Sequence, residues 1–118
     1  MTVIVQAPPV AAAPLRSADE QARLGALAEA LGRAHALHRL CAGPADDRWR
    51  APMQRLLEAE HATPALRDRL VLRFNAGFAG VRARRCGPAS RAELAQAAAQ
   101  GRDLARGLAG AAPAGSPP

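Results

Sequence analysis

The chain has 118 residues, enough for one small domain, and 49% of them are hydrophobic, although many of these are alanine. Its aromatic residues are Trp49, Phe74 and Phe78, so the core must be thin and built mainly from leucine. The net charge of +6 comes from arginine, without any lysine, and Asp and Glu are interspersed through most of the chain. This favours a solvated basic surface over a nucleic-acid footprint.

The two ends of the chain differ in composition from its middle. The small-residue run "VAAAP" resembles the end of a secretory signal, although a basic n-region is missing and the apolar run "TVIV" is short. We expect residues 1–16 to be a disordered leader or the remnant of a signal peptide. The helical domain should span residues 17–109, and residues 110–118 should form a disordered Pro/Gly/Ala tail. No stretch reaches the ~20 apolar residues of a transmembrane helix.

The first half of the domain predicts two helices. One spans residues 18–40, where Ser17 and Glu20 form a capping-box pattern and Gly43-Pro44 provides a stop signal. The second spans residues 47–60, with Asp46 or Asp47 as the cap. Pro52 predicts either a kink in this helix or a start nearer Ala51, because proline is poorly tolerated in a helix interior.

The second half predicts two more helices. One spans residues 64–84 and begins with a Thr63 cap followed by Pro64; its Gly77 and Gly80 would permit the close approach of a neighbouring helix. The last spans residues 91–108, with Ser90 and Glu93 as a second capping box. No segment shows sustained period-2 alternation. The fold class is therefore all-α, a small four-helix bundle made of two helical hairpins with short connections.

The two cysteines, Cys41 and Cys86, each precede Gly or Ala-Gly and a proline, near the predicted ends of the first and third helices. In an up-down-up-down bundle these ends lie together, which makes a disulfide plausible and implies an oxidising compartment. Free thiols, a redox pair and a metal site that includes His35 and His38 remain as alternatives. The His and Cys spacing is not that of a structural zinc site, so we expect neither a metal nor a cofactor.

Four residues are candidates for binding: His35, Arg48, Trp49 and Asn75. Arginine and tryptophan are enriched at binding hot spots, and Asn75 lies between the two phenylalanines. For each residue a structural role is the more common outcome, such as a packed histidine or a core tryptophan. The sequence contains no defensible catalytic triad, phosphate-binding glycine loop or pair of catalytic carboxylates, so we do not expect an enzyme.

Three separated stretches resemble one family when taken together. They are "LAEALGRAHALHRLCAG", "RWRAPMQRLLEAE" and "RLVLRFNAGFAG", followed by a second cysteine and an Ala/Leu-rich helix. The chain resembles, over residues 23–109, an uncharacterised family of short secreted helical proteins from alphaproteobacteria, a domain of unknown function. The resemblance implies export and an all-helical fold. The residues that match its pattern are His35, Cys41, Arg48, Trp49, Asn75, Gly77 and Cys86. Pro52 and the incomplete signal depart from it.

The sequence thus predicts a small exported helical protein that acts as a non-enzymatic binding or structural module of the periplasm. Its partner would be a protein or another envelope component, and its oligomeric state is open. The alternative is a cytoplasmic nucleic-acid-binding domain that uses Arg82, Arg84 and Arg85, the densest basic cluster in the chain. A weaker alternative is metal binding through His35 and Cys41.

Overall fold

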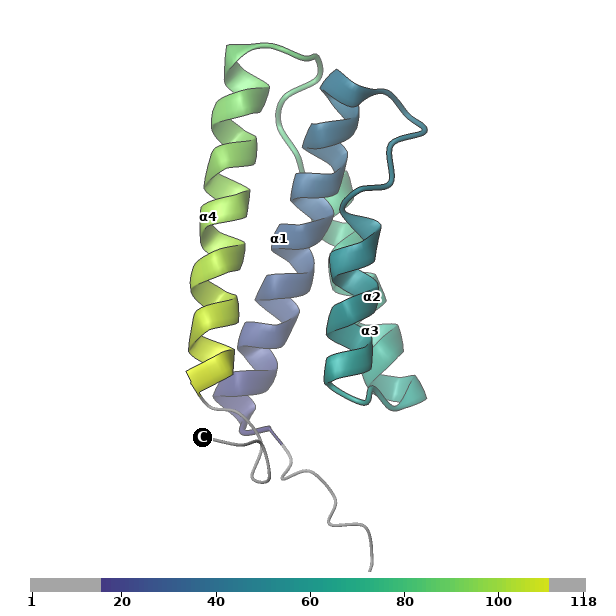
Figure 1. Ribbon diagram of the computed structural model, residues 1–118, viewed down its shortest axis with the longest axis vertical. Helices are drawn as coiled ribbons and strands as arrows, with labels where there is room; N and C mark the ends of the chain where they lie inside the picture. Colours follow the sequence, from purple (N-terminus) through teal and green to yellow (C-terminus); the bar gives the residue numbers. More distant parts are fainter. Residues whose placement is uncertain (1–15, 111–118) are drawn as a thin grey trace, which may run out of the picture.

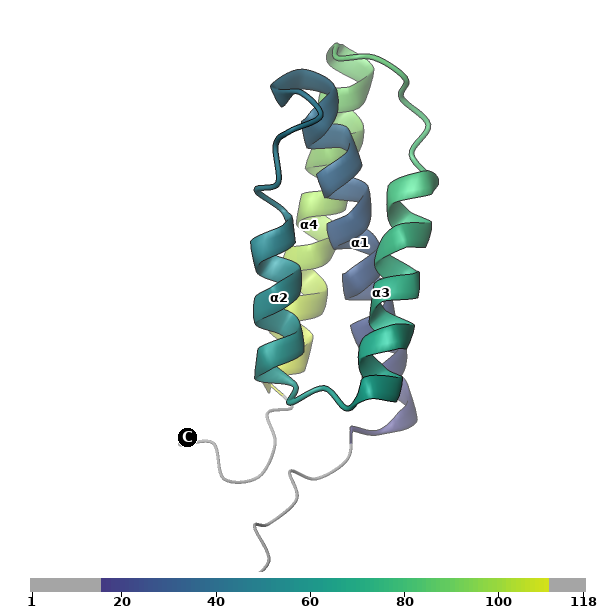
Figure 2. The same cartoon turned by 90° about the vertical axis from the view of Figure 1, so that its right-hand side faces the viewer.

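The computed structural model describes residues 16–110, which form four α-helices and no strand (Figure 1). The helices are α1 (Ala18–Ala42), α2 (Arg50–Ala59), α3 (Pro64–Ala79) and α4 (Pro88–Gly110). Successive helices run in opposite directions, so that α1 is parallel to α3 (Figures 1 and 2). The predicted four-helix bundle of two hairpins is confirmed. The predicted leader and tail lie outside the described residues, except for Arg16 and Gly110.

Helix α1 is the centre of the bundle. Its backbone packs closely against α3 and α4 and much less closely against α2, and Figure 2 shows it between α2 and α3. Four consecutive residues, 34–37, are buried, so this part of the helix is covered on all sides rather than on one face. Its leucines form the main core cluster with residues from the other helices, including Met53, Leu70 and Leu108. None of the described helices is both long enough and apolar enough to cross a membrane.

Two glycines bring α1 and α3 into backbone contact. A Cβ atom on Gly32 of α1 would overlap the carbonyl oxygen of Phe74, and one on Gly77 of α3 would overlap the carbonyl oxygen of Glu29. Each helix therefore places a glycine against the other's backbone. The Arg73 guanidinium lies 2.8 Å from the Glu29 carboxylate and joins the same two helices. The close approach predicted for Gly77 is confirmed, whereas Gly80 ends α3 as its C-cap.

The first helices begin and end largely as predicted. Ser17 and Glu20 form the expected capping box, and α1 continues to Ala42, where Gly43 has a φ of 100° that favours glycine. Helix α2 begins at Arg50, so Pro52 lies in its first turn, where its missing N–H costs no helical hydrogen bond. Neither predicted aspartate caps α2, because Trp49 occupies the N-cap position. Asp46 instead accepts a hydrogen bond from the Arg48 N–H.

The predicted boundary between α3 and α4 is wrong in two respects. Helix α3 ends at Ala79 rather than at residue 84, and α4 begins at Pro88 rather than at residue 91. The Glu93 carboxylate accepts hydrogen bonds from the Arg82 and Ala83 N–H groups, at 2.9 and 3.0 Å, and holds the connecting segment against α4. These bonds, first the one from Arg82, lower the pKa of Glu93. Ser90 lies inside the first turn and bonds back to Gly87, so the predicted Ser90–Glu93 capping box does not form.

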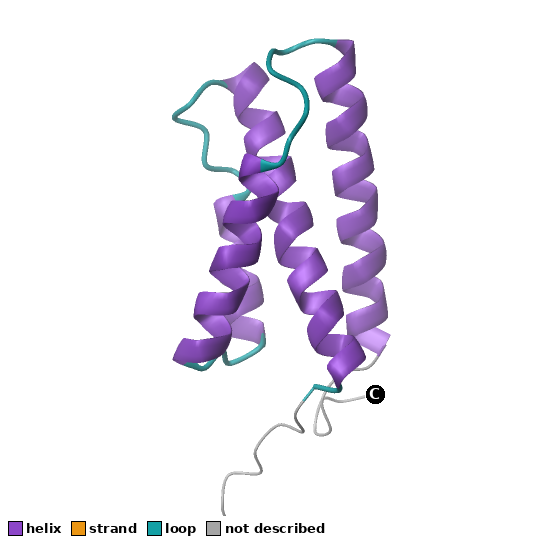
Figure 3. Ribbon diagram, turned by 180° about the vertical axis from the view of Figure 1, so that it is seen from behind, coloured by secondary structure: helices purple, strands orange, loops and turns teal. Residues whose placement is uncertain are grey.

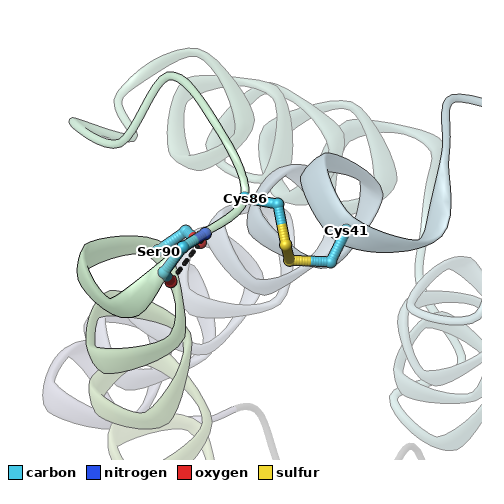
Figure 4. The surroundings of a disulfide bond; sticks show 4 residues. Cys41, Cys86 and Ser90 are labelled. Atoms are coloured by element: carbon cyan, nitrogen blue, oxygen red, sulfur yellow. Dashed lines mark hydrogen bonds between the residues drawn. A yellow bond between two sulfur atoms is a disulfide. The ribbon is translucent and has the colours of Figure 1, made fainter.

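Cys41 and Cys86 are joined as a disulfide (Figure 4). Cys41 lies in the last turn of α1, whereas Cys86 lies in the α3–α4 connection rather than at the end of α3. The two Cα atoms are 4.9 Å apart, at a sequence separation of 45. The α1–α2 and α3–α4 connections lie at the same end of the bundle, as Figure 3 shows from behind. The bridge therefore ties the end of the central helix to the start of α4. Cys41 is consequently not available to join His35 in a metal site.

Arg16 joins three helices at the opposite end of the bundle. Its guanidinium donates two hydrogen bonds to the Glu60 carboxylate just after α2, at 3.0 and 2.9 Å. It also donates to Glu20 in α1 and to the Leu108 carbonyl oxygen in α4. The Arg16 and Glu60 side chains are only 14% and 10% exposed. A bidentate, largely buried pair of this kind holds the C-terminal end of α2 in a defined position beside α1 and α4.

The glycine contact predicts that Gly77→Ala destabilises the protein by about 1–3 kcal/mol, because the added methyl forces α1 and α3 apart. Helix propensity alone would predict that the same substitution raises the free energy of unfolding by ~1 kcal/mol. The steric contact and helix propensity therefore predict changes of opposite sign. Gly25→Ala on α1 is the control, since its Cβ would meet the Arg73 side chain of α3 at an ordinary distance of 3.5 Å. Urea unfolding followed by circular dichroism measures both variants. Equal or greater stability of Gly77→Ala would contradict the close contact.

The disulfide predicts a large loss of stability on reduction. The chain-entropy treatment gives about 4 kcal/mol for a loop of this length. The Cys41→Ser/Cys86→Ser double variant and the dithiothreitol-reduced wild-type protein should therefore unfold at the same, lower urea concentration. Both cysteines are exposed, so a reductant reaches the bond without prior unfolding. Identical midpoints for the oxidised and reduced wild-type protein would show that the bridge does not stabilise the bundle.

Candidate ligand-binding cavity

An open cavity of about 420 Å³ lies between α1, α2 and α3. Its volume falls within the range of small-molecule sites. The apolar part of its wall consists of Met53, Leu57, Val71, Phe74 and Phe78, and the polar part consists of His35, Arg39, Arg50, Gln54, Arg67 and Asn75. An apolar wall with a few converging polar groups is typical of a binding site. This cavity therefore qualifies as the candidate site.

His35 lies on the α1 side of this cavity. It is 6% exposed and packs between two aromatic rings of α3, with ring centroids 5.7 Å from Phe74 and 5.5 Å from Phe78. Burial lowers its pKa, and the nearby charges of Arg39 and Arg50 lower it further. Both effects favour the neutral form of the imidazole. Its Nδ1 has no hydrogen-bond partner among the described residues, which is unusual for a buried polar atom.

Three arginines from three different helices line the cavity: Arg39 from α1, Arg50 from α2 and Arg67 from α3. Within residues 16–110, no carboxylate oxygen lies within 4.0 Å of a nitrogen of these three guanidinium groups. The ion pairs of this part of the chain are formed by other cations. The Arg39 guanidinium carbon lies 5.5 Å from the centroid of the Phe78 ring. This is within cation–π range and places the cation at the cavity wall.

The four binding candidates predicted from the sequence do not form one site. His35 and Asn75 line the same cavity, from α1 and α3. Trp49 instead packs against the hydrophobic core and borders an apolar hollow of about 400 Å³ between α1, α2 and α4. Arg48 is exposed before α2. The basic cluster Arg82, Arg84 and Arg85 lies exposed on the α3–α4 connection just before Cys86, and none of the three lines the cavity.

The sequence analysis missed the three cavity arginines and the residues of α2. A local signal for them exists, because each arginine lies three or four residues from another residue of the cavity wall. Arg39 follows His35 by four, Arg50 precedes Met53 by three, and Arg67 precedes Val71 by four. Such spacings place residues on the same face of a helix. The signal was not sufficient alone, since many of the 16 basic residues have an apolar neighbour at this spacing.

A further hollow, of about 780 Å³, lies between α1, α3 and α4. Its charged lining includes both signs, with Glu29 and Glu93 beside Arg33 and Arg82. Both glutamates already bond to neighbouring groups of the fold, Glu29 to Arg73 and Glu93 to the α3–α4 connection. This hollow therefore offers less free hydrogen-bonding capacity than the cavity between α1, α2 and α3. No group of three or more potential metal ligands occurs among the described residues.

Comparison with known proteins identifies the family of the chain. No curated protein and no solved structure matches it. The family described as "Protein of unknown function (DUF2385)" matches residues 20–111, which include all of α2, α3 and α4 and nearly all of α1. The match therefore contains both cysteines and the whole cavity wall. Since it covers more than half of the sequence, the chain belongs to this family of proteins of unknown function.

Proposed function

We propose that the protein is an exported, non-enzymatic binding module of the periplasm, and that it binds an envelope component in the cavity between α1, α2 and α3. The observation that carries the proposal is the cavity itself, whose wall combines an apolar surface with arginines that have no carboxylate partner within residues 16–110. Arg39 is half-buried and Arg50 and Arg67 are exposed, so their guanidinium groups can form charge-assisted hydrogen bonds with a ligand that carries negative charge.

The disulfide supports the periplasmic part of the proposal. Bonds of this kind persist in oxidising compartments and are rare in the cytosol of mesophiles. The bridge here joins distant elements of a thin-cored domain and is exposed to solvent. In a reducing compartment such a bond would be lost, together with much of the stability of a domain this small. The placement of the bond thus supports a structural role in an exported protein.

The wall of the cavity supports a binding rather than a catalytic role. Among the described residues, its titratable side chains are His35 and the three arginines, and none of its lining side chains carries a carboxylate, thiol or hydroxyl group. Neither a nucleophile with an adjacent base nor a pair of acid and base groups can be assembled from these residues. The amides of Gln54 and Asn75 supply both donors and acceptors of hydrogen bonds. These groups can orient a ligand without transforming it.

The compartment can be tested in cells of the source bacterium that express the gene at its own locus. We expect the protein in the periplasmic fraction, with neither Cys41 nor Cys86 modified by a thiol-reactive mass tag unless a reductant is added first. The Cys41→Ser variant serves as the control, since its remaining thiol must react. Protein found in the cytoplasm with two reactive thiols would refute export.

The binding role can be tested by titrating the isotopically labelled, oxidised protein with a solvent extract of the cell envelope. We expect saturable changes in the amide NMR spectrum at cavity residues such as Asn75, and none at exposed residues of α4 such as Arg106. Filling the cavity with the Asn75→Trp substitution should abolish these changes. Changes confined to other surfaces, or no changes at all, would refute binding in this cavity.

A further inference from the structure

The direction of the helices divides the cavity into two ends. Helices α1 and α3 run parallel and α2 runs against them (Figure 2). The start of α2, with Arg50, therefore lies at the same end as the later turns of α1, with Arg39. Both cations lower the pKa of His35, whereas Asp46 and Asp47, just before α2, raise it. The charged side chains that line this end of the cavity are therefore Arg39 and Arg50.

The rest of the cavity holds most of its apolar wall, together with Arg67 near the start of α3 and the amides of Gln54 and Asn75. Met53 and Leu57 follow Arg50 along α2, and both are more than 90% buried. Val71 and Phe74 lie opposite them on α3. From Arg50 to Leu57 the helix rises by roughly 10 Å, which is about the length of an extended chain of eight carbon atoms. The site therefore has room for an elongated apolar group beyond its charged end.

On the basis of the proposed function, we propose that the ligand is a small organic carboxylate with an apolar body. Arg39 and Arg50 bind its carboxylate through charge-assisted hydrogen bonds. Its apolar body packs against Val71 and Phe74, which are still partly exposed, and removes their surface from water. The amide of Asn75 contributes a further hydrogen bond from α3. The ring of His35 forms part of the same wall, but its Nδ1 is inaccessible to solvent and is not available to the ligand.

Other classes of ligand fit the cavity less well. Inorganic phosphate would neutralise the arginines but leave the apolar wall exposed. A neutral or cationic amphiphile would cover that wall and leave three unpaired cations around it, or add a fourth. Duplex nucleic acid cannot enter a cavity of about 420 Å³. Only an anion that also carries an apolar group satisfies both halves of the wall.

The inference can be tested with four probes added to the oxidised full chain below their micelle concentrations: octanoate, 1-octanol, octylammonium and acetate. The first three share a tail and differ in charge, whereas acetate has the charge without the tail. Calorimetry and amide NMR should show octanoate bound in the cavity, with each other probe at least about tenfold weaker. Equal binding of octanol or octylammonium would overturn the anion selectivity, and equal binding of acetate would overturn the role of the apolar wall.

Two matched variants locate the charge recognition. The Arg39→Gln/Arg50→Gln double variant should weaken octanoate at least about tenfold and leave octanol unchanged. Arg84→Gln/Arg91→Gln removes the same net charge from exposed positions outside the cavity and should bind octanoate as the wild type does. Equal loss in both pairs would reduce the effect to net charge and overturn the inference. If the cavity variant fails to fold, the probe series on the wild-type protein still decides.

This experiment separates the inference from the proposed function. Envelope-extract binding in the cavity without octanoate binding would overturn the carboxylate inference and leave the binding role intact. The absence of both would overturn both.

Discussion

The backbone contact between α1 and α3 determines where the other two helices can lie. Gly32 and Gly77 each face a carbonyl group of the opposite helix, so the two axes come closer than side chains normally permit. Because α1 and α3 are parallel, the connection that follows α1 and the connection that follows α3 lie at the same end of the bundle. The two cysteines can meet there. Helix α4 packs on another side of α1, and α2 remains as the least closely packed helix. The cavity borders this helix.

Much of this arrangement can be predicted from local sequence signals. The capping box at Ser17, the Thr63-Pro64 start and the Gly43-Pro44 stop place three helix ends to within about two residues. They are reliable because the groups involved are close in the chain. The signals fail between α3 and α4, where Glu93 bonds across 10 and 11 residues to Ala83 and Arg82. A tertiary hydrogen bond there replaces the local capping box.

The site was less predictable than the fold for the same reason. His35 and Asn75 stood out because each is an unusual residue type on an apolar face. The three arginines did not, since they come from separate helices and resemble the other arginines of a basic surface. Only their convergence on one hollow, without carboxylates, distinguishes them. Convergence is a property of the packed helices, which the spacing along one helix does not contain.

The disulfide also closes residues 41–86 into a covalent ring that contains all of α2 and α3. Within this ring α2 has the fewest backbone contacts, and its N-terminus has no side-chain cap. Separation of α2 from the bundle breaks the Arg16–Glu60 pair and exposes Met53 and Leu57. It leaves a short tethered segment, so the loop-closure entropy lost when α2 packs back is small. The α1–α3 contact does not have to break for this to occur. The ring thus permits local opening of the wall at a lower free energy than global unfolding.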